Sequence, residues 1–222
     1  MPADSQAEKS PYLRPRDAAC LILVDRSNGS PRVLVGKRSS SHVFMPDVYV
    51  FPGGRRDPRD RALPFGVDLN PLVIDKLRRS ASRAVTVAGA RALALAAVRE
   101  LEEETGLCFR TERAQQGPDL SPLRYVARAI TPPGRIRRFD TRFFFCLTDD
   151  VGIEPANIKD SAELQDLQWL DMRDSSGVNM AAITRMVLED VTNFMIGDQP
   201  LQFESRVRLY FERRGTFIRG FL

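Results

Sequence analysis

Alanine, leucine, arginine and glutamate fill the stretch from Ala88 to Thr105, and this stretch constrains the fold more than any other part of the sequence. These residues are strong helix formers, and Gly106 supplies the left-handed residue that commonly ends a helix. We therefore expect one long helix over residues 88–105. Its apolar stripe of Leu93, Ala97 and Leu101 should hold it against a sheet.

Three glutamates share one face near the end of this helix. Glu100, Glu103 and Glu104 are three and four positions apart, so their side chains lie together, whereas Glu102 points elsewhere. The negative end of the helix dipole disfavours each acid by about 0.3 to 1 kcal/mol, and the carboxylates also repel one another. A hard divalent cation would offset both costs, because it prefers oxygen ligands. Three glutamates alone are more often a solvated helix end, so the surrounding residues must decide.

Composition indicates a globular chain without membrane spans. Its 222 residues fit one domain, 1–222, with elaborations. Three cysteines without Cys-x-x-Cys spacing argue against a disulfide framework or a zinc site, and the polar N-terminus lacks the apolar run of a secretory signal, so we expect a cytoplasmic location. The net charge of +4 comes mainly from arginines. Such a charge suits phosphate recognition and makes nucleic acid a less favoured partner than a small nucleotide.

The remaining pattern is that of an α/β protein. Phe143, Phe144 and Phe145 follow one another, which predicts a strand buried on both faces. His42, the only histidine, is given no role. The apolar runs predict strands at 18–24, 32–37, 48–51, 125–130, 141–147 and 164–170, and further helices at 71–82 and 180–194.

Residues 99–107 read Arg-Glu-Leu-Glu-Glu-Glu-Thr-Gly-Leu. They resemble the second half of the Nudix box, Gly-x5-Glu-x7-Arg-Glu-U-x-Glu-Glu-x-Gly-U, in which U is a bulky apolar residue. The preceding Phe51-Pro52-Gly53-Gly54 resembles the loop with which that box begins. This resemblance implies a Nudix-type α/β/α sandwich with a mixed β-sheet, and a hydrolase that cuts a phosphoanhydride bond with the help of Mg²⁺ or Mn²⁺.

The box is interrupted in this chain. Gly54 and Arg99 lie 45 positions apart, whereas the uninterrupted pattern places them 14 apart, so we expect an insertion at residues 55–86. Counted back from Arg99, the box glutamate falls on Arg91, and counted forward from Gly54 it falls on Asp60. That acid is therefore either lost or supplied by Asp60. Beyond the box, we expect residues 173–222 to form a C-terminal helical elaboration.

An interrupted box is similar to that of the coenzyme A and acyl-coenzyme A diphosphatase branch. The segments 34–39, 45–54 and 137–144 also resemble this branch, and the resemblance covers roughly residues 18–172. It implies coenzyme A or acyl-coenzyme A as substrate. Three alternatives stay open: a Nudix hydrolase of ADP-ribose or another nucleotide derivative, a non-catalytic Nudix-fold binding module, and an RNA-processing hydrolase.

The resemblance also implies roles for individual residues. Arg99 would pin a carboxylate of the glutamate trio through a charge-assisted hydrogen bond, and the oligomeric state, a homodimer included, stays open. The catalytic candidates are Glu100, Glu103 and Arg99; the metal-ligand candidates are Glu100, Glu103, Glu104, the Gly53 carbonyl and Glu163; and the substrate-binding candidates are Arg38, Arg135, Arg137 and Arg138.

Overall fold

A computed structural model describes residues 13–40, 45–79, 85–109, 116–195 and 201–222, and His42 lies outside these ranges. The strands are β1 (Arg16–Asp25), β2 (Arg32–Arg38), β3 (Tyr49–Val50), β4 (Gly53–Arg55), β5 (Arg124–Ile130), β6 (Phe139–Leu147), β7 (Leu164–Asp171), β8 (Arg208–Arg213) and β9 (Thr216–Phe221). The helices are α1 (Pro71–Arg79), α2 (Val87–Thr105) and α3 (Ala182–Phe194), with short 3-10 turns at Pro58–Arg61, Asp149–Val151 and Pro155–Asn157. No helix in the described ranges is long and apolar enough to cross a membrane.

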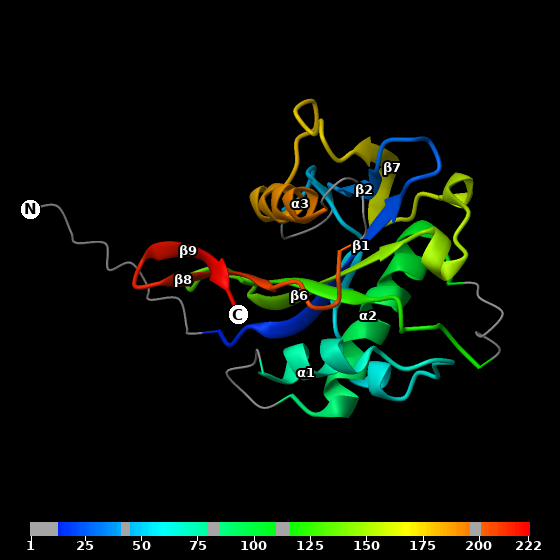
Figure 1. The fold of residues 1–222 in the computed structure, drawn as a ribbon. Coiled ribbons are helices and arrows are strands. Elements are labelled where there is room, and N and C mark those ends of the chain that lie inside the picture. Colours follow the sequence, from blue (N-terminus) through cyan, green and yellow to red (C-terminus); the bar gives the residue numbers. More distant parts are fainter. Residues whose placement is uncertain (1–12, 41–44, 80–84, 110–115, 196–200) are drawn as a thin grey trace, which may run out of the picture.

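The strands form one mixed sheet, which passes through the middle of the molecule (Figure 1). Its main order is β3-β2-β1-β6-β5-β8-β9, while β4 pairs with β1 and β7 pairs with β2. The pairs β1–β6 and β5–β8 are parallel, and the other pairs are antiparallel. The long parallel pair β1–β6 forms the centre of the sheet, and the predicted hairpin of residues 18–24 and 32–37 is confirmed as β1 and β2.

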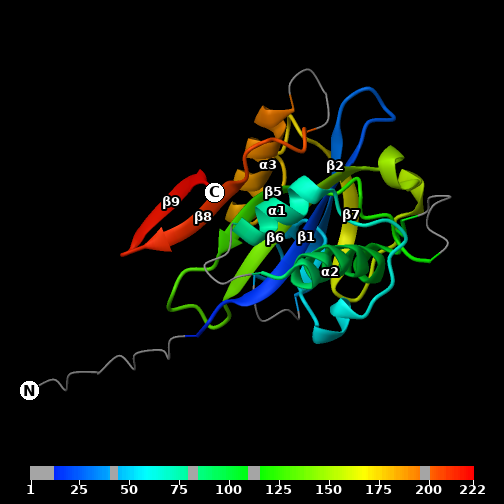
Figure 2. The ribbon, with the colours of Figure 1, turned by 60° about the horizontal axis from the view of Figure 1, so that its bottom comes forward.

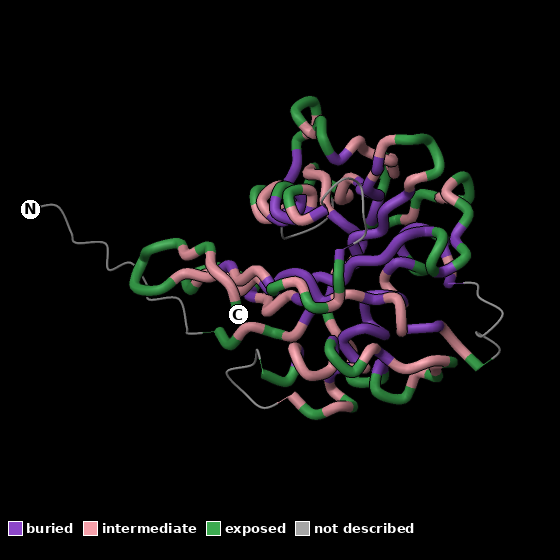
Figure 3. The backbone as a smooth tube through the Cα atoms, in the orientation of Figure 1, coloured by how far each residue is buried: buried purple, intermediate pink, exposed green. Residues whose placement is uncertain are grey.

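Helices cover both faces of this sheet. In Figure 1, α1 and α2 lie on one side of β1 and β6, and α3 lies on the other; Figure 2 shows α1 and α2 turned toward the viewer. Phe144 packs into the apolar cluster on the α2 side, whereas Phe143 and Phe145 pack into the cluster that contains residues of α3. Burial on both faces of β6 and the α/β sandwich with a mixed sheet are thus confirmed. Figure 3 shows the buried chain concentrated in these central strands.

Helix α2 has well-defined ends. The Thr86 hydroxyl accepts a hydrogen bond of 3.0 Å from the Gly89 N–H and so caps the N-terminus. Gly106, with φ of 70°, ends the helix, and its N–H donates to the Glu102 carbonyl over 2.9 Å. The predicted helix 88–105 is therefore confirmed to within one residue. Its apolar side is fully buried against the sheet, which fixes the direction in which its acids point.

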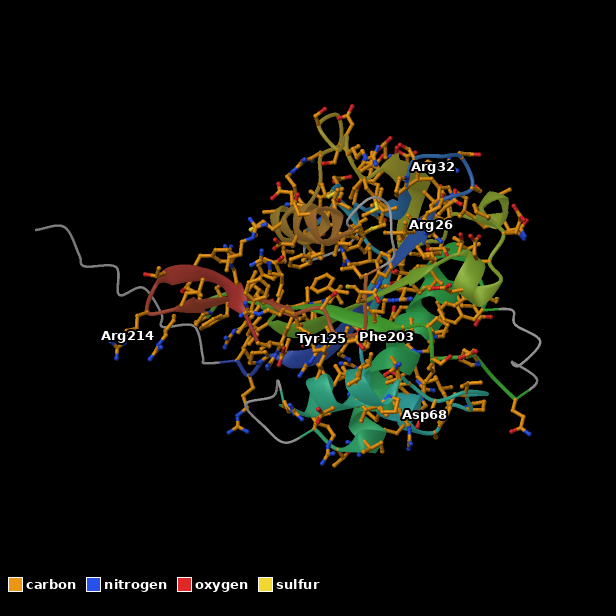
Figure 4. All side chains as sticks on the ribbon, in the orientation of Figure 1. Arg26, Arg32, Asp68, Tyr125, Phe203 and Arg214 are labelled. Carbon is orange, nitrogen blue, oxygen red and sulfur yellow. The ribbon has the colours of Figure 1, made fainter. Side chains whose placement is uncertain are left out.

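The segment between β4 and α2 is folded against α2. Arg91 forms a bidentate ion pair with Asp68, with Nε–Oδ1 and Nη2–Oδ2 distances of 2.9 and 2.6 Å. The Arg91 guanidinium also lies 5.5 Å from the centre of the Phe65 ring. The residue that falls where the box glutamate would stand therefore holds the insertion in place. Figure 4 shows Asp68 beside the α1 and α2 layer.

The C-terminal part corrects one expectation. Residues 182–194 are helical as predicted, but residues 208–221 form the β8–β9 hairpin and not a further helix. Its turn places Arg214 at φ of 51° and Gly215 at φ of 77°, the backbone that a two-residue hairpin turn requires. Arg208 and Arg213 therefore lie on strand β8, and Arg214 lies in the turn that follows it. Arg214 lies at the tip of the hairpin, which extends away from the body of the molecule (Figure 4).

Candidate active site

A pocket of about 460 Å³ lies between the end of α2, the glycine loop, β6 and the start of α3. Acidic side chains form one wall. Phe139 and Phe143 from β6 and Ile183 from α3 line the same pocket. The acids that line it are Glu100, Glu103 and Glu104 of α2 and Glu163 from the loop before β7. The structure therefore brings all four predicted acidic residues to one cavity, and Glu102 is not among its lining residues, as predicted.

The glycine loop approaches α2 closely. The Gly53 N–H donates a hydrogen bond of 2.8 Å to Oε2 of Glu104. At Gly54, an added Cβ would lie 2.5 Å from the carboxyl carbon of Glu100, and at Gly53, where φ is 154°, it would lie 2.5 Å from the Ala19 carbonyl oxygen. Only glycine allows this approach. The loop thus places backbone groups directly against the acids.

Arg99 organises the acidic wall. Its Nε donates to Oδ1 of Asp60 over 2.8 Å, and its Nη1 lies 2.9 Å from Oε1 of Glu100 and 2.8 Å from Oε2 of Glu103. Asp60 is fully buried within the 3-10 turn of the insertion. The hydrogen bond that Arg99 donates to Asp60 is the main reason why the pKa of Arg99 is raised. The insertion therefore supplies an acid to Arg99, and that Asp60 replaces the missing box acid stays a prediction.

Burial and mutual repulsion destabilise the charged forms of two acids. Burial, together with the negative charge of Glu100, raises the pKa of Glu104 to about 8, although the hydrogen bond from the Gly53 N–H opposes this shift. Burial also raises the pKa of Glu100, although the Arg99 charge opposes this shift. The acidic wall therefore holds more negative charge than its protein neighbours stabilise.

The donor chemistry of this wall fits a divalent cation. Each glutamate of the trio has one oxygen engaged: Glu100 and Glu103 accept from Arg99, and Glu104 accepts from Gly53. Among the described residues, the second oxygen of each glutamate accepts no hydrogen bond, and it could bind a hard cation that would relieve the repulsion. Within the described residues, no three such side chains converge tightly enough to enclose a metal ion as they stand. What suits a divalent cation at this wall is therefore the set of carboxylate oxygens and their uncompensated negative charge.

The predicted substrate-binding arginines separate into two groups. Arg38 and Arg137 line the pocket, and the Arg38 charge lowers the pKa of Glu104 in opposition to its burial. Arg138 is 7% exposed and donates to the carbonyl oxygens of Thr131 and Leu13. These two contacts engage the Arg138 guanidinium, and Arg138 does not line the pocket, which corrects its assignment to substrate. Arg135 is exposed on the same loop and does not line the pocket.

Several lining residues were missed in the sequence. Met45, Ile183 and Thr184 face the cavity from segments far from the box, and Cys20 contributes from β1. In the sequence, these residues are marked only by their closeness to the starts of predicted strands and helices, and such a position does not indicate that a residue lines a pocket. Only the packing of α3 over the sheet brings them to the acids.

Comparison with known proteins agrees with this geometry. A model of the NUDIX domain matches residues 85–189. A protein of Caenorhabditis elegans, named "Putative nudix hydrolase 7", is 28% identical over 185 residues, which are 72% of this chain and 52% of that protein. The chain therefore spans about half the length of this relative.

Solved structures show the same fold. The crystal structure of a NUDIX hydrolase from Alicyclobacillus acidocaldarius is 28% identical, with a TM-score of 0.59 over 79% of this chain and 90% of that chain. The NUDIX domain of Shewanella oneidensis NrtR, solved with ADP ribose, is 14% identical, with a TM-score of 0.51 over 84% and 94% of the two chains, and this likeness shows the fold alone. The chain carries a Nudix domain.

Proposed function

We propose that the protein is a metal-dependent hydrolase that cuts the phosphoanhydride bond of a nucleoside diphosphate linked to a second moiety. The observation that carries this proposal is the single pocket in which the glycine loop, the glutamate trio of α2 and Arg99 meet. The NUDIX domain match and the two relatives at 28% identity support the same class of reaction.

The residues of the acidic wall would divide the work. We assign Glu100, Glu103 and Glu104 as metal ligands, with the Gly53 carbonyl and Glu163 as further donors on the same cavity. A bound Mg²⁺ or Mn²⁺ would neutralise phosphate charge and activate water. Arg99 acts as a positioning residue, because it holds Glu100 and Glu103 while Asp60 holds Arg99. Water adds to one phosphorus, the bridging P–O bond breaks, and two monophosphates leave.

Among substrates of this class, we propose coenzyme A or an acyl-coenzyme A. Two observations support this choice. First, the insertion that interrupts the box folds back so that its Asp60 accepts a hydrogen bond from Arg99. This contact is expected if the interrupted box still works as a catalytic site. Apolar side chains from β6 and α3 line the same pocket as the acids, as does Arg137, and such a lining suits a ligand that is partly apolar and partly anionic.

A substrate panel tests the proposal. With Mg²⁺ or Mn²⁺, coenzyme A should give 3′,5′-ADP and 4′-phosphopantetheine, which mass spectrometry detects directly. If ADP-ribose has a far higher kcat/KM than every coenzyme A ester, the class stands and the substrate is wrong. If no phosphoanhydride in the panel is cut with either metal, the protein is a binding module.

Variants of the trio test the mechanism. Glu103→Gln and Glu104→Gln should each lower kcat at least about 100-fold, because each removes a charged metal oxygen without changing shape. Glu102→Gln is the matched control, since Glu102 is exposed and does not line the pocket. Near-normal turnover in both trio variants, with unchanged thermal melts, would remove these acids from catalysis.

A further inference from the structure

The N-terminus of α3 lies at the same pocket as the acids. Ala181, Ile183 and Thr184 all line the cavity. The N-cap residue is Ala181, which has no side chain able to accept a hydrogen bond from the first turn. In the ranges that the structure describes, the N–H groups of residues 182, 183 and 184 donate to no protein atom. A helix of 13 residues therefore presents its positive end to the cavity.

This helix end is held rigidly in place. The Ala181 N–H donates to the Tyr49 carbonyl over 3.1 Å, and the Tyr49 N–H donates to the Asn179 carbonyl over 2.9 Å. From inside the helix, Arg185 donates back to the Val178 carbonyl over 2.8 Å. These bonds tie the start of α3 to the strand that leads into the glycine loop. The helix end is thus fixed relative to the acidic wall before any ligand arrives.

The Thr184 hydroxyl adds a second and independent sign of a ligand. Thr184 is 3% exposed, and its hydroxyl forms no hydrogen bond with any residue that the structure describes. The hydroxyl oxygen is not among the fully enclosed side-chain atoms that lack a partner, so it opens on the cavity that Thr184 lines. Because Thr184 lines the cavity, a group bound there would satisfy it. Arg137, on the same cavity, adds positive charge on this side.

We propose that the N-terminus of α3, together with the Thr184 hydroxyl, binds a phosphomonoester that the substrate carries in addition to its diphosphate. Three N–H groups and a hydroxyl around a positive helix end match a compact tetrahedral oxyanion. The acidic wall, with the divalent metal that it would hold, would take the diphosphate, so the two anionic groups of one ligand would occupy different parts of the pocket. The statement about the substrate rests on the proposed function, whereas the anion site stands on the geometry of α3.

Paired nucleotides that differ by one phosphate test this inference. Wild-type protein should have a clearly higher kcat/KM for coenzyme A than for dephospho-coenzyme A, which lacks only the 3′-phosphate. Thr184→Val should lower kcat/KM for coenzyme A about tenfold, since it removes one hydrogen bond to a charged group, and leave dephospho-coenzyme A nearly unchanged. Thr192→Val is the matched control, because Thr192 lies on α3 and its hydroxyl donates to the Leu188 carbonyl, outside the cavity.

A second variant removes one of the N–H donors. Ala182→Pro fits the first helical position, since Ala182 is exposed and Ala181 already has the extended backbone, φ of −54° and ψ of 135°, that precedes proline. It should weaken recognition of the extra phosphate in the same direction as Thr184→Val. An unchanged preference for coenzyme A in both folded variants overturns the inference.

Binding without metal separates this inference from the proposed function. Calorimetry should give a higher affinity for 3′,5′-ADP than for 5′-AMP, and Thr184→Val should abolish most of the difference. If no substrate is hydrolysed but this difference is found, the anion site stands and the proposed function fails. If coenzyme A is hydrolysed but wild-type protein binds 3′,5′-ADP and 5′-AMP equally, the anion site is wrong and the proposed function stands.

Discussion

Gly54 shows how a single missing side chain shapes the acidic wall. Gly54→Ala would place a methyl group 2.5 Å from the carboxyl carbon of Glu100, which must then turn away from the pocket. The backbone can accept alanine, because φ at Gly54 is not positive. We therefore expect kcat to fall about tenfold or more through misplaced metal ligation, with a nearly unchanged melting temperature.

The control for this variant is Gly177→Ala. An added Cβ at Gly177 meets no atom within 4 Å, so its kinetics should equal those of the wild type. Steady-state kinetics at saturating metal and thermal melts check both variants. A Gly54→Ala protein with full activity would show that the position of Glu100 does not limit turnover.

At the same scale, the sequence predicted the acids better than the cations. The trio was found because charge, helix spacing and resemblance all point to it, whereas Glu163 was named from the resemblance alone. Arg135, Arg137 and Arg138 are neighbours of one residue type, and the sequence cannot tell which of them faces the pocket. Only the turn of the β5–β6 loop decides that Arg137 lines the cavity and Arg138 holds the Leu13 and Thr131 carbonyls.

Two ion pairs hold the inserted segment on α2, and we expect different effects on kcat and stability when each is broken. Asp60 binds Arg99, which contacts Glu100 and Glu103, whereas Asp68 binds Arg91, away from the pocket. Asp60→Asn should lower kcat about tenfold or more and cost about 3 kcal/mol of unfolding free energy, because a buried ion pair is broken. Asp68→Asn should cost about 1 kcal/mol or less and leave kcat nearly unchanged, because that pair is partly exposed.

Urea unfolding and steady-state kinetics of the two variants give both quantities. The difference in kcat between the two variants is the informative result, since both variants loosen the same insertion. If Asp68→Asn lowered kcat as much as Asp60→Asn, the insertion as a whole would matter to catalysis, and the particular contact of Asp60 with Arg99 would not.

Elements with a strong local pattern were predicted, and those fixed by a short turn were not. Helix α2 and the central strands carry long runs of periodic apolar residues. The β8–β9 hairpin depends on the dipeptide Arg214-Gly215 between two short strands, and glycine was its only strong signal. That α3 lines the pocket could not be predicted, because only the packing of the whole domain brings Thr184 and Glu104 to the same cavity.

Across the whole molecule, Asp190 joins the C-terminal hairpin to α3. It accepts hydrogen bonds from Tyr210 and Arg219, and Arg208 lies 2.9 Å from its Oδ1. Burial alone would raise the pKa of Asp190, but these partners together lower it. Because the folded-state pKa lies below the unfolded value, the stability that Asp190 contributes is present above about pH 4 and is lost as pH falls through the folded pKa.

Asp190→Asn should therefore lower the unfolding free energy by about 2 kcal/mol at pH 7, because it removes the buried negative charge that pairs with the partly exposed Arg208 and Arg219. The difference from wild type should narrow as pH falls from 5 toward 3. Urea unfolding across this range measures it, with the exposed neighbour Glu189→Gln as control. A gap that stays constant with pH would mean that the carboxylate charge of Asp190 does not hold the hairpin.

The alanine at the start of α3 has a consequence for anyone who tries to improve this protein. A screen for heat resistance would favour Ala181→Asp or Ala181→Ser, because a capping side chain commonly adds about 1 kcal/mol to a helix. The same side chain would occupy the backbone donors that the cavity leaves open, and aspartate would also repel an anion. Selection for robustness alone would thus drive this position away from ligand recognition, as in other proteins where function and stability compete for one site.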